Sequence, residues 1–135
     1  MLTILASAKP SPIHGVGLFA DQFIPKGTIT WRFDPTFDIF FTEDEVEKLP
    51  EPQKRLIKFF AYFSAGRKVY IYSIDDSRFL NHSTHPNNDC PLLHGETELC
   101  NISNRDIQIG EELTVDYRSF DDIDKESRSA YLQNS

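Results

Sequence analysis

The chain has 135 residues, a formal net charge of −7 and 39% apolar residues, among them eleven phenylalanines. This length predicts one domain over residues 1–135, and the aromatic content is enough for a compact core. The acidic balance argues against direct binding to nucleic acid and favours a basic partner. No apolar run approaches the roughly 20 residues that span a bilayer, and no basic region with an apolar core opens the chain. We therefore expect no membrane contact and a cytoplasmic location, unless the protein is exported to a host cell or nucleus.

The N-terminal part of the chain predicts short strands separated by turns. Apolar and β-branched runs predict strands over residues 2–6, 16–20, 28–33 and 37–41. The segment Lys9-Pro10-Ser11-Pro12 should break any regular structure. The pair of glycines in Gly15-Val16-Gly17 is, on its own, most simply a turn, although glycine there also lets a ligand approach the main chain. Ile24-Pro25-Lys26-Gly27 is typical of a type II turn.

Two short helices are expected next. Thr42-Glu43-Asp44-Glu45 matches the capping-box pattern and predicts a helix that Pro50 ends. A second helix is expected over residues 52–63, with Gly66 as its end. Four apolar residues in it recur at positions i, i+3, i+4 and i+7 and predict one buried face, namely Leu56, Phe59, Phe60 and Phe63.

The second half of the chain predicts further strands around an irregular polar segment. Strands are expected over residues 68–74 and 112–117, with a hairpin of 90–93 and 98–102 between them. The polar tail over residues 121–132 is expected to be helical. The fold class is therefore mainly β, a β-rich α+β fold with many short strands and two or three short helices.

The polar segment over residues 78–88 is costly to order unless it binds a ligand or closes a polar network. His82 and His85 are spaced HxxH near Cys90 and Cys100, but this spacing is not a standard set of zinc ligands, and we expect no metal. Ser83 beside His82 lacks the Gly-x-Ser-x-Gly turn that exposes a hydrolase nucleophile. A metal-dependent hydrolase is thus a minor alternative. The cysteines show no CxxC spacing and are compatible with a reducing compartment.

Three segments resemble, in order, the three signature motifs of the SET-domain protein-lysine methyltransferases. They are Gly15-Val16-Gly17, then residues 78–83 with Pro86-Asn87, then residues 110–117, and together they bracket residues from about 11 to 120. The short middle region is similar to that of the compact stand-alone members found in bacteria and viruses. The resemblance implies the SET fold, with several small sheets and a C-terminal segment that forms a pseudoknot.

The resemblance also implies an activity and a site. The family transfers a methyl group from S-adenosyl-L-methionine to the ε-amino group of a protein lysine through a narrow channel. Tyr117 would be the catalytic tyrosine, Arg78 would brace its loop, and Glu112 and Asp116 would be structural. The residues that would bind the cofactor are Gly15, Val16, Gly17, Asn81, His82, Tyr117 and Phe120.

Some features depart from the family pattern. Thr84 stands where the family commonly has a cysteine, and the flanking cysteine-rich segments are absent. Closing the site would fall to Phe120 and the tail over 121–135, or to a second chain in a homodimer. The early strand has no clear channel tyrosine, so the candidates for the channel wall are Trp31, Phe33, Tyr62, Tyr70, Tyr72 and Val115. The alternative function is a SET-fold module without catalysis that binds a lysine-rich protein.

Overall fold

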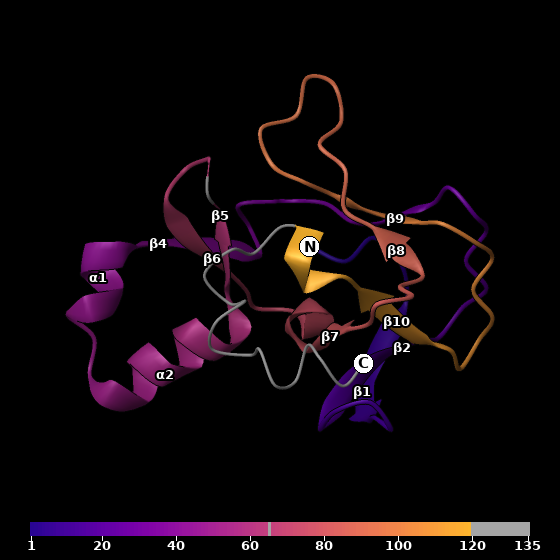
Figure 1. Ribbon diagram of the computed structural model, residues 1–135, viewed down its shortest axis with the longest axis horizontal. Helices are drawn as coiled ribbons and strands as arrows, with labels where there is room; N and C mark the ends of the chain where they lie inside the picture. The colour runs from indigo at the N-terminus through magenta and orange to yellow at the C-terminus, as the bar shows by residue number, and fades with distance from the viewer. Residues whose placement is uncertain (65, 120–135) are drawn as a thin grey trace.

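The computed structural model describes residues 1–64 and 66–119, which form three small sheets and few helices (Figure 1). The sheet orders are β1-β2-β10-β7, β3-β9-β8 and β4-β6-β5. The expected mainly β fold is confirmed. The strands are β1 Ala6–Pro10, β2 Val16–Ala20, β3 Ile29–Trp31, β4 Asp38–Thr42, β5 Tyr62–Ser64, β6 Val69–Ser73, β7 Asn81–His82, β8 Asn88–Asp89, β9 Asn101–Ser103 and β10 Glu112–Val115. The helices are α1 Glu43–Glu47, α2 Glu51–Phe60 and the 3₁₀ turns η1 Asp76–Phe79 and η2 Tyr117–Ser119.

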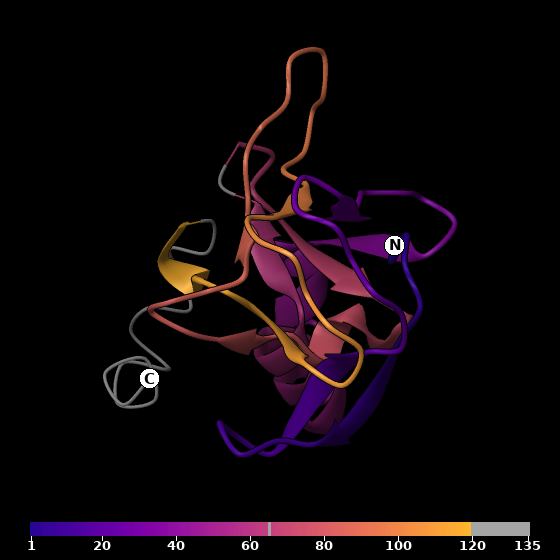
Figure 2. The same cartoon turned by 90° about the vertical axis from the view of Figure 1, so that its right-hand side faces the viewer.

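The strand β10 occupies the centre of the first sheet and joins segments that are far apart in the sequence. It pairs antiparallel with β2, where Leu113 lies opposite Leu18. On its other side it pairs parallel with β7, where Val115 lies opposite His82. Figure 2 shows β10 in contact with both neighbours. The three motifs therefore meet on adjacent strands, while the pseudoknot stays an expectation drawn from the family.

The core beneath this sheet is aliphatic. Leu18, Ile24, Ile107 and Leu113 are at most 1% exposed and form one cluster. The main chains of Ile24 and Ile107 exchange hydrogen bonds of 2.9 and 2.8 Å, which fixes the turn before β10 against the turn after β2. Burying side chains of this size contributes about 1.5–3 kcal/mol each to folding.

The helices differ from the expectation in where they end and which side chains they bury. The Thr42 side chain accepts from the Glu45 N–H and the reciprocal bond is present, so the capping box is confirmed. The second helix ends at Phe60, not near Gly66, because Ala61 is extended and leads into β5. The apolar run that suggests one longer helix is therefore divided between α2 and β5.

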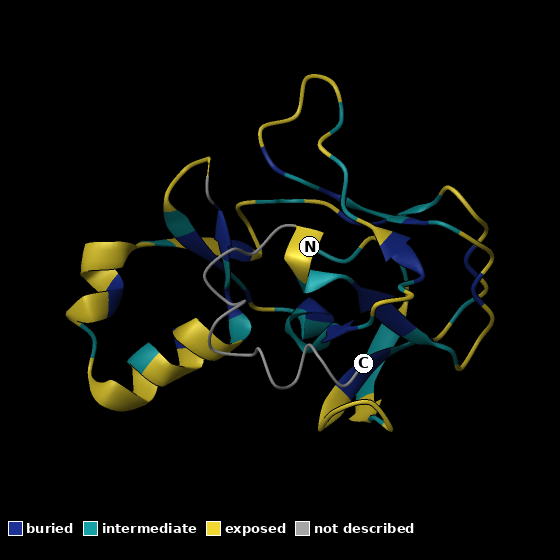
Figure 3. Ribbon diagram, in the orientation of Figure 1, coloured by how far each residue is buried: buried dark blue, intermediate teal, exposed yellow. Residues whose placement is uncertain are grey.

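The predicted buried stripe of this helix is confirmed only in part. Leu56 and Phe59 are 41% and 51% exposed, whereas Ile57 is buried. Phe63 is buried, but as part of β5. Figure 3 shows α2 mostly exposed, because it lies at one end of the molecule and only its inner side meets the sheet. Periodicity located an apolar face, and tertiary placement left half of it in solvent.

Two strand predictions are also corrected. The first strand covers Ala6–Pro10 instead of 2–6, and the proline is tolerated because β1 is an edge strand. Residues 90–93 form no strand, and β9 pairs instead with β8. Phe120 and the expected tail helix over 121–132 lie outside the described residues. Neither α1 nor α2, the longest helices described, has the length and apolar character to cross a membrane.

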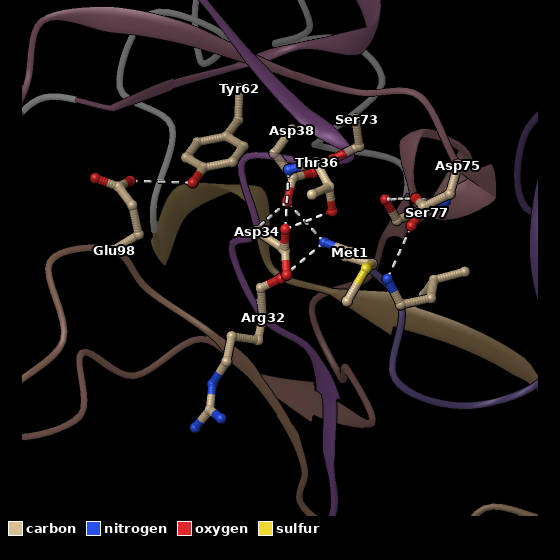
Figure 4. Close-up of polar contacts among 11 residues, drawn as sticks. Met1, Arg32, Asp34, Thr36, Asp38, Tyr62, Ser73, Asp75, Ser77 and Glu98 are labelled. Atoms are coloured by element: carbon tan, nitrogen blue, oxygen red, sulfur yellow. Dashed lines mark hydrogen bonds and ion pairs between the residues drawn. The ribbon is translucent and has the colours of Figure 1, made fainter.

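A buried carboxylate anchors the start of the chain to β4 (Figure 4). The Asp38 side chain is fully buried and pairs with the Met1 ammonium at 2.8 Å. The same carboxylate accepts from the Asp34 N–H at 2.8 Å and from the Ser73 hydroxyl at 2.5 Å. Three donors thus compensate one buried charge, which would otherwise be costly.

Two isoleucines two residues apart test the core. Ile107→Ala should lower the free energy of unfolding by about 2–5 kcal/mol, because it opens a cavity in the fully buried cluster. Ile109→Ala is the control, since Ile109 is 69% exposed, and its effect should stay within about 0.5 kcal/mol. Urea unfolding measures both. Equal effects of the two substitutions would contradict this assignment of the core.

Candidate active site

The amide of Asn81 connects the glycine loop to the central strands. Its Nδ2 donates to the carbonyl oxygens of His14 and Val16 at 3.0 and 3.2 Å. Glu112 Oε2 lies 2.9 Å from the same nitrogen, so the two N–H groups are shared among three acceptor oxygens. Asn81 itself is buried on β7. One side chain thus brings Gly15-Val16-Gly17, β7 and the start of β10 together, as the order of the motifs required.

The two glycines of the loop are needed for different reasons. Gly15 has φ +46°, a conformation that favours glycine, and a side chain there would meet no atom within 4 Å. A Cβ at Gly17 would lie 2.5 Å from Glu112 Oε2. The obstacle to a side chain at Gly17 is therefore the protein itself.

Glu112 and Asp116 have structural partners, as expected. Glu112 Oε1 accepts from the Ser11 hydroxyl at 2.6 Å. Asp116 accepts from the Arg118 guanidinium at 2.7 and 2.9 Å, and this contact lowers the pKa of the carboxyl. Arg78 donates to the carbonyl oxygens of Ile74 and Asp75, which confirms its bracing contacts.

The buried imidazole of His82 is hydrogen-bonded to the main chain at Tyr117. His82 is 0% exposed, and its Nδ1 accepts from the Tyr117 N–H at 3.1 Å. Asp116 Oδ1 lies 3.5 Å from the same nitrogen. Because the ring is enclosed by the protein, this arrangement assigns it to holding the turn at Tyr117.

A pocket of about 90 Å³ lies where Tyr117 meets the β4-β6-β5 sheet. Its volume holds several water molecules, since one needs about 10–15 Å³. Its wall is mostly aromatic and aliphatic, with a few polar side chains. The lining residues are Trp31, Phe60, Ala61, Tyr62, Ile71, Ser73, Ser77, Arg78, Leu80, Cys90, Leu99, Asn101, Val115 and Tyr117.

The structure places some channel candidates at this pocket and others elsewhere. Trp31, Tyr62 and Val115 line it together with Tyr117. Three others do not line it. Phe33 stacks on Phe40, Tyr70 is a member of the buried cluster around Val46, and Tyr72 packs against that cluster.

The Tyr117 hydroxyl is fixed at the pocket by the main chain. It donates to the carbonyl oxygen of Leu80, the residue before Asn81. The His82 and Tyr117 rings lie 5.5 Å apart between centroids. Three consecutive residues of the middle motif therefore hold the site together. Leu80 holds the Tyr117 hydroxyl, Asn81 holds the glycine loop, and His82 holds the Tyr117 N–H.

Sequence reasoning did not identify several residues of the pocket. The sequence predicts Phe60 as core and Cys90 as part of a strand, whereas both line the pocket. Burial raises the pKa of the Cys90 thiol to about 12, so it stays protonated near neutral pH. No motif marked these positions. Among the residues the structure describes, no group of three or more His, Cys, Asp or Glu side chains is arranged to hold a metal ion.

Gly17→Ala tests the close packing of the glycine loop against Glu112. The added methyl group would press on Glu112, which is held by Ser11 and Asn81, and we expect a loss of about 1–3 kcal/mol in unfolding free energy. The control is Gly66→Ala, since a methyl group there meets no atom within 4 Å. Thermal unfolding compares them. A Gly17→Ala protein as stable as the control would show that the loop is not confined in this way.

Comparison with known proteins agrees with this geometry. The SET domain profile matches residues 15–118. The chain is 28% identical over 130 residues to "Histone-lysine N-methyltransferase, H3 lysine-4 specific" of Mycosarcoma maydis, covering 86% of this chain and 8% of that protein. It is 29% identical over 122 residues to human "Histone-lysine N-methyltransferase 2B", covering 80% of this chain and 4% of that one. The chain thus spans only a small part of these relatives.

Solved structures share the fold. A humanized mutant of the Chaetomium thermophilum Polycomb Repressive Complex 2, bound to an inhibitor, matches 87% of this chain and 15% of that chain with a TM-score of 0.62 and 21% identity. Apo ctPRC2 with mutations in Ezh2 matches 92% of this chain and 16% of that chain with a TM-score of 0.66 and 20% identity. At such identities the likeness concerns the fold alone. Because the family profile covers most of the sequence, including all three motifs, the chain belongs to the SET-domain family.

Proposed function

We propose that this chain transfers a methyl group from S-adenosyl-L-methionine to the ε-amino group of a lysine in a protein substrate. The observation that carries the proposal is the junction of two parts of the molecule. The glycine loop held by Asn81 adjoins, through Leu80 and His82, a pocket with the Tyr117 hydroxyl fixed at it. The names of the relatives, which are lysine methyltransferases, support the same reaction.

The glycine loop fits a bound cofactor. Space is open around Gly15, and Val16 is 43% exposed. Asn81 fixes the loop from below through the carbonyl oxygens of His14 and Val16, so the loop is ordered without a ligand on its outer side. S-Adenosyl-L-methionine, when bound there, would supply a methyl group on a positively charged sulfur.

The pocket wall favours the reactive form of lysine. Free lysine has a pKa of about 10.4, so removing its proton at pH 7 costs roughly 4–5 kcal/mol. Trp31, Ile71, Leu80 and Val115 offer an aromatic and aliphatic surface that disfavours an ammonium by desolvation. The amine is therefore driven toward its neutral, nucleophilic form as it enters.

Tyr117 orients the amine. Its single phenolic proton is donated to the Leu80 carbonyl oxygen, so its own oxygen can only accept a hydrogen bond from a bound group. An amine that donates to this oxygen is held in a defined direction, and alignment of this kind supplies much of the rate of a transfer reaction.

The substrate we propose is a basic protein segment that carries the target lysine. The net charge of −7 favours association with a cationic chain. Because the relatives include proteins named for H3 lysine-4, histone H3 is the first substrate to test. A binding module without catalysis would recognise the same segment but leave its mass unchanged.

Tyr117→Phe tests the reaction. Loss of the hydroxyl should lower kcat by about tenfold or more, since the amine loses its orienting acceptor. Cofactor binding by calorimetry should persist, because the Tyr117 N–H that His82 accepts is retained. Tyr72→Phe is the control, since Tyr72 packs outside the pocket, and its kcat should stay within about twofold of wild type.

Mass spectrometry of histone H3 and other basic proteins after incubation with the cofactor measures this rate. A Tyr117→Phe enzyme as fast as the control would contradict the role of the hydroxyl. Wild-type protein that binds basic segments yet adds no methyl group to any of them would favour the binding module.

A further inference from the structure

The proposed reaction releases a proton for which no acceptor has been named. Lysine reaches the pocket mostly as an ammonium, because the pKa of its free side chain is about 10.4. The nitrogen must lose one proton before it can attack a methyl group. The phenol of Tyr117 keeps its own proton on the Leu80 carbonyl oxygen, and a protonated phenol is too weak a base to take a second one. The other polar side chains of the pocket therefore decide where the lysine proton goes.

Four of the described residues that line the pocket carry a hydroxyl group, and each of these groups donates its proton to another part of the protein. A hydroxyl oxygen accepts a proton on one side while its own proton passes to a base on the other. Such a pair carries a proton out of the pocket only if its acceptor is a base that water reaches. The pairs are Tyr117 with the Leu80 carbonyl oxygen, Tyr62 with Glu98, Ser73 with Asp38 and Ser77 with Asp75.

Three of these four pairs do not meet the condition. The acceptor of Tyr117 is a main-chain carbonyl oxygen, which is not a base near neutral pH. The Glu98 side chain is 5% exposed and pairs with Arg67 at 2.6 Å. The Asp38 side chain is 0% exposed and pairs with the Met1 ammonium at 2.8 Å. Both carboxylates are thus closed off from water and already matched by a cation.

The fourth acceptor, Asp75, is only half-buried (Figure 4). It is the N-cap of η1, where its Oδ1 accepts from the Ser77 hydroxyl and from the Ser77 N–H, the latter at 3.0 Å. Its Oδ2 accepts from the Leu2 N–H at 2.8 Å. Ser77 is 7% exposed and lines the pocket. One buried hydroxyl therefore connects the pocket to a carboxylate that solvent reaches.

The charges around Asp75 leave its carboxylate bonded to neutral donors. Arg78 Nη1 donates to the main-chain carbonyl oxygen of Asp75 at 3.1 Å. Burial lowers the pKa of the Met1 ammonium, and the charges of Asp38 and Asp75 oppose that shift, but the ammonium pairs with Asp38. Asp76 is the next carboxylate in the same turn. The carboxylate of Asp75 itself accepts from the neutral groups of Leu2 and Ser77.

We propose that Ser77 and Asp75 form the exit route for the lysine proton. This inference rests on the proposed methyl transfer. A water molecule in the pocket, whose volume of about 90 Å³ has room for it, carries the proton from the ammonium to Ser77 Oγ. The Ser77 hydroxyl proton moves to Asp75 Oδ1, and Asp75 releases it to solvent.

The remaining step balances the charge. The neutral nitrogen forms its bond to the methyl carbon while the bond between that carbon and sulfur breaks. The electron pair of the broken bond stays on sulfur, and the positive charge passes from sulfur to the methylated nitrogen. Ser77 and Asp75 are then back in their starting protonation states.

Two substitutions block the route without removing the cap of η1. Asp75→Asn keeps a side-chain oxygen at the N-cap, but an amide does not take up the proton. Ser77→Ala removes the hydroxyl and keeps the N–H that donates to Asp75. Each should lower kcat/KM at pH 7 by about tenfold or more, because only lysine that enters without its proton then reacts. The double variant should be no slower than the slower single variant, since both changes block one route.

The pH dependence distinguishes a proton route from a structural role. The neutral fraction of free lysine rises about tenfold per pH unit below its pKa, so the deficit of both variants should shrink as the pH is raised from 7 toward 10. The measurement is the initial rate of methylation of histone H3, or of the basic protein with the highest rate, by mass spectrometry. Thermal unfolding identifies the folded variants, and Ser77→Ala carries the test if Asp75→Asn does not fold.

The matched control is Asp76→Asn in the same turn. Asp76 does not belong to the pocket lining, so this control removes one negative charge next to Asp75 and leaves the Ser77 hydroxyl in place. Its kcat/KM should stay within about twofold of wild type at every pH.

The outcomes separate the two proposals. If the wild-type chain is active and the deficit of the variants is equal at every pH, Ser77 and Asp75 are structural and the exit route is overturned. Full activity of both variants at pH 7 overturns it as well, and in either case the methyl transfer stands. A wild-type chain that transfers no methyl group to any substrate overturns both proposals.

Discussion

The arrangement of the site depends on three hydrogen-bond contacts of the Asn81 amide nitrogen, whose two N–H groups are shared among three oxygen atoms. Two of them hold the glycine loop and the third holds Glu112 at the start of β10. The remaining contacts of the site come from the residues on either side of Asn81, since His82 Nδ1 accepts from the Tyr117 N–H and the Leu80 carbonyl oxygen accepts from the Tyr117 hydroxyl. Hydrogen bonds between buried groups are costly to leave unmade, so these contacts support one another.

The pocket unites features from all three sheets. Trp31 comes from β3, Ile71 from β6 and Val115 from β10. The buried Asp38 stabilises this junction from outside, because the carboxylate holds the hydroxyl of Ser73, which lines the pocket, and the start of the chain. No single sheet is large enough to enclose a ligand, so the pocket exists only where the sheets meet.

Local signals were readable from the sequence, and tertiary placement was not. The capping box at Thr42 and the three motifs were predicted, since their meaning depends on residue type and order. The exposure of Phe59 and the end of α2 were not, because an apolar period does not tell which side of a helix meets the sheet. Glu98 carried no motif at all, since its burial depends on donors 31 to 36 residues away, from Tyr62 to Arg67.

The central position of β10 has a consequence for synthesis on the ribosome. Residues 112–115 fill the gap between β2 and β7, so these two strands can join one sheet only after β10, which follows both of them in the chain, has been synthesised. Until then Asn81 cannot donate to Glu112, and His82 cannot accept from the main-chain N–H of Tyr117. Pairings over such sequence separations form slowly, so the contacts that bring the glycine loop and Tyr117 together form late in the folding of this domain.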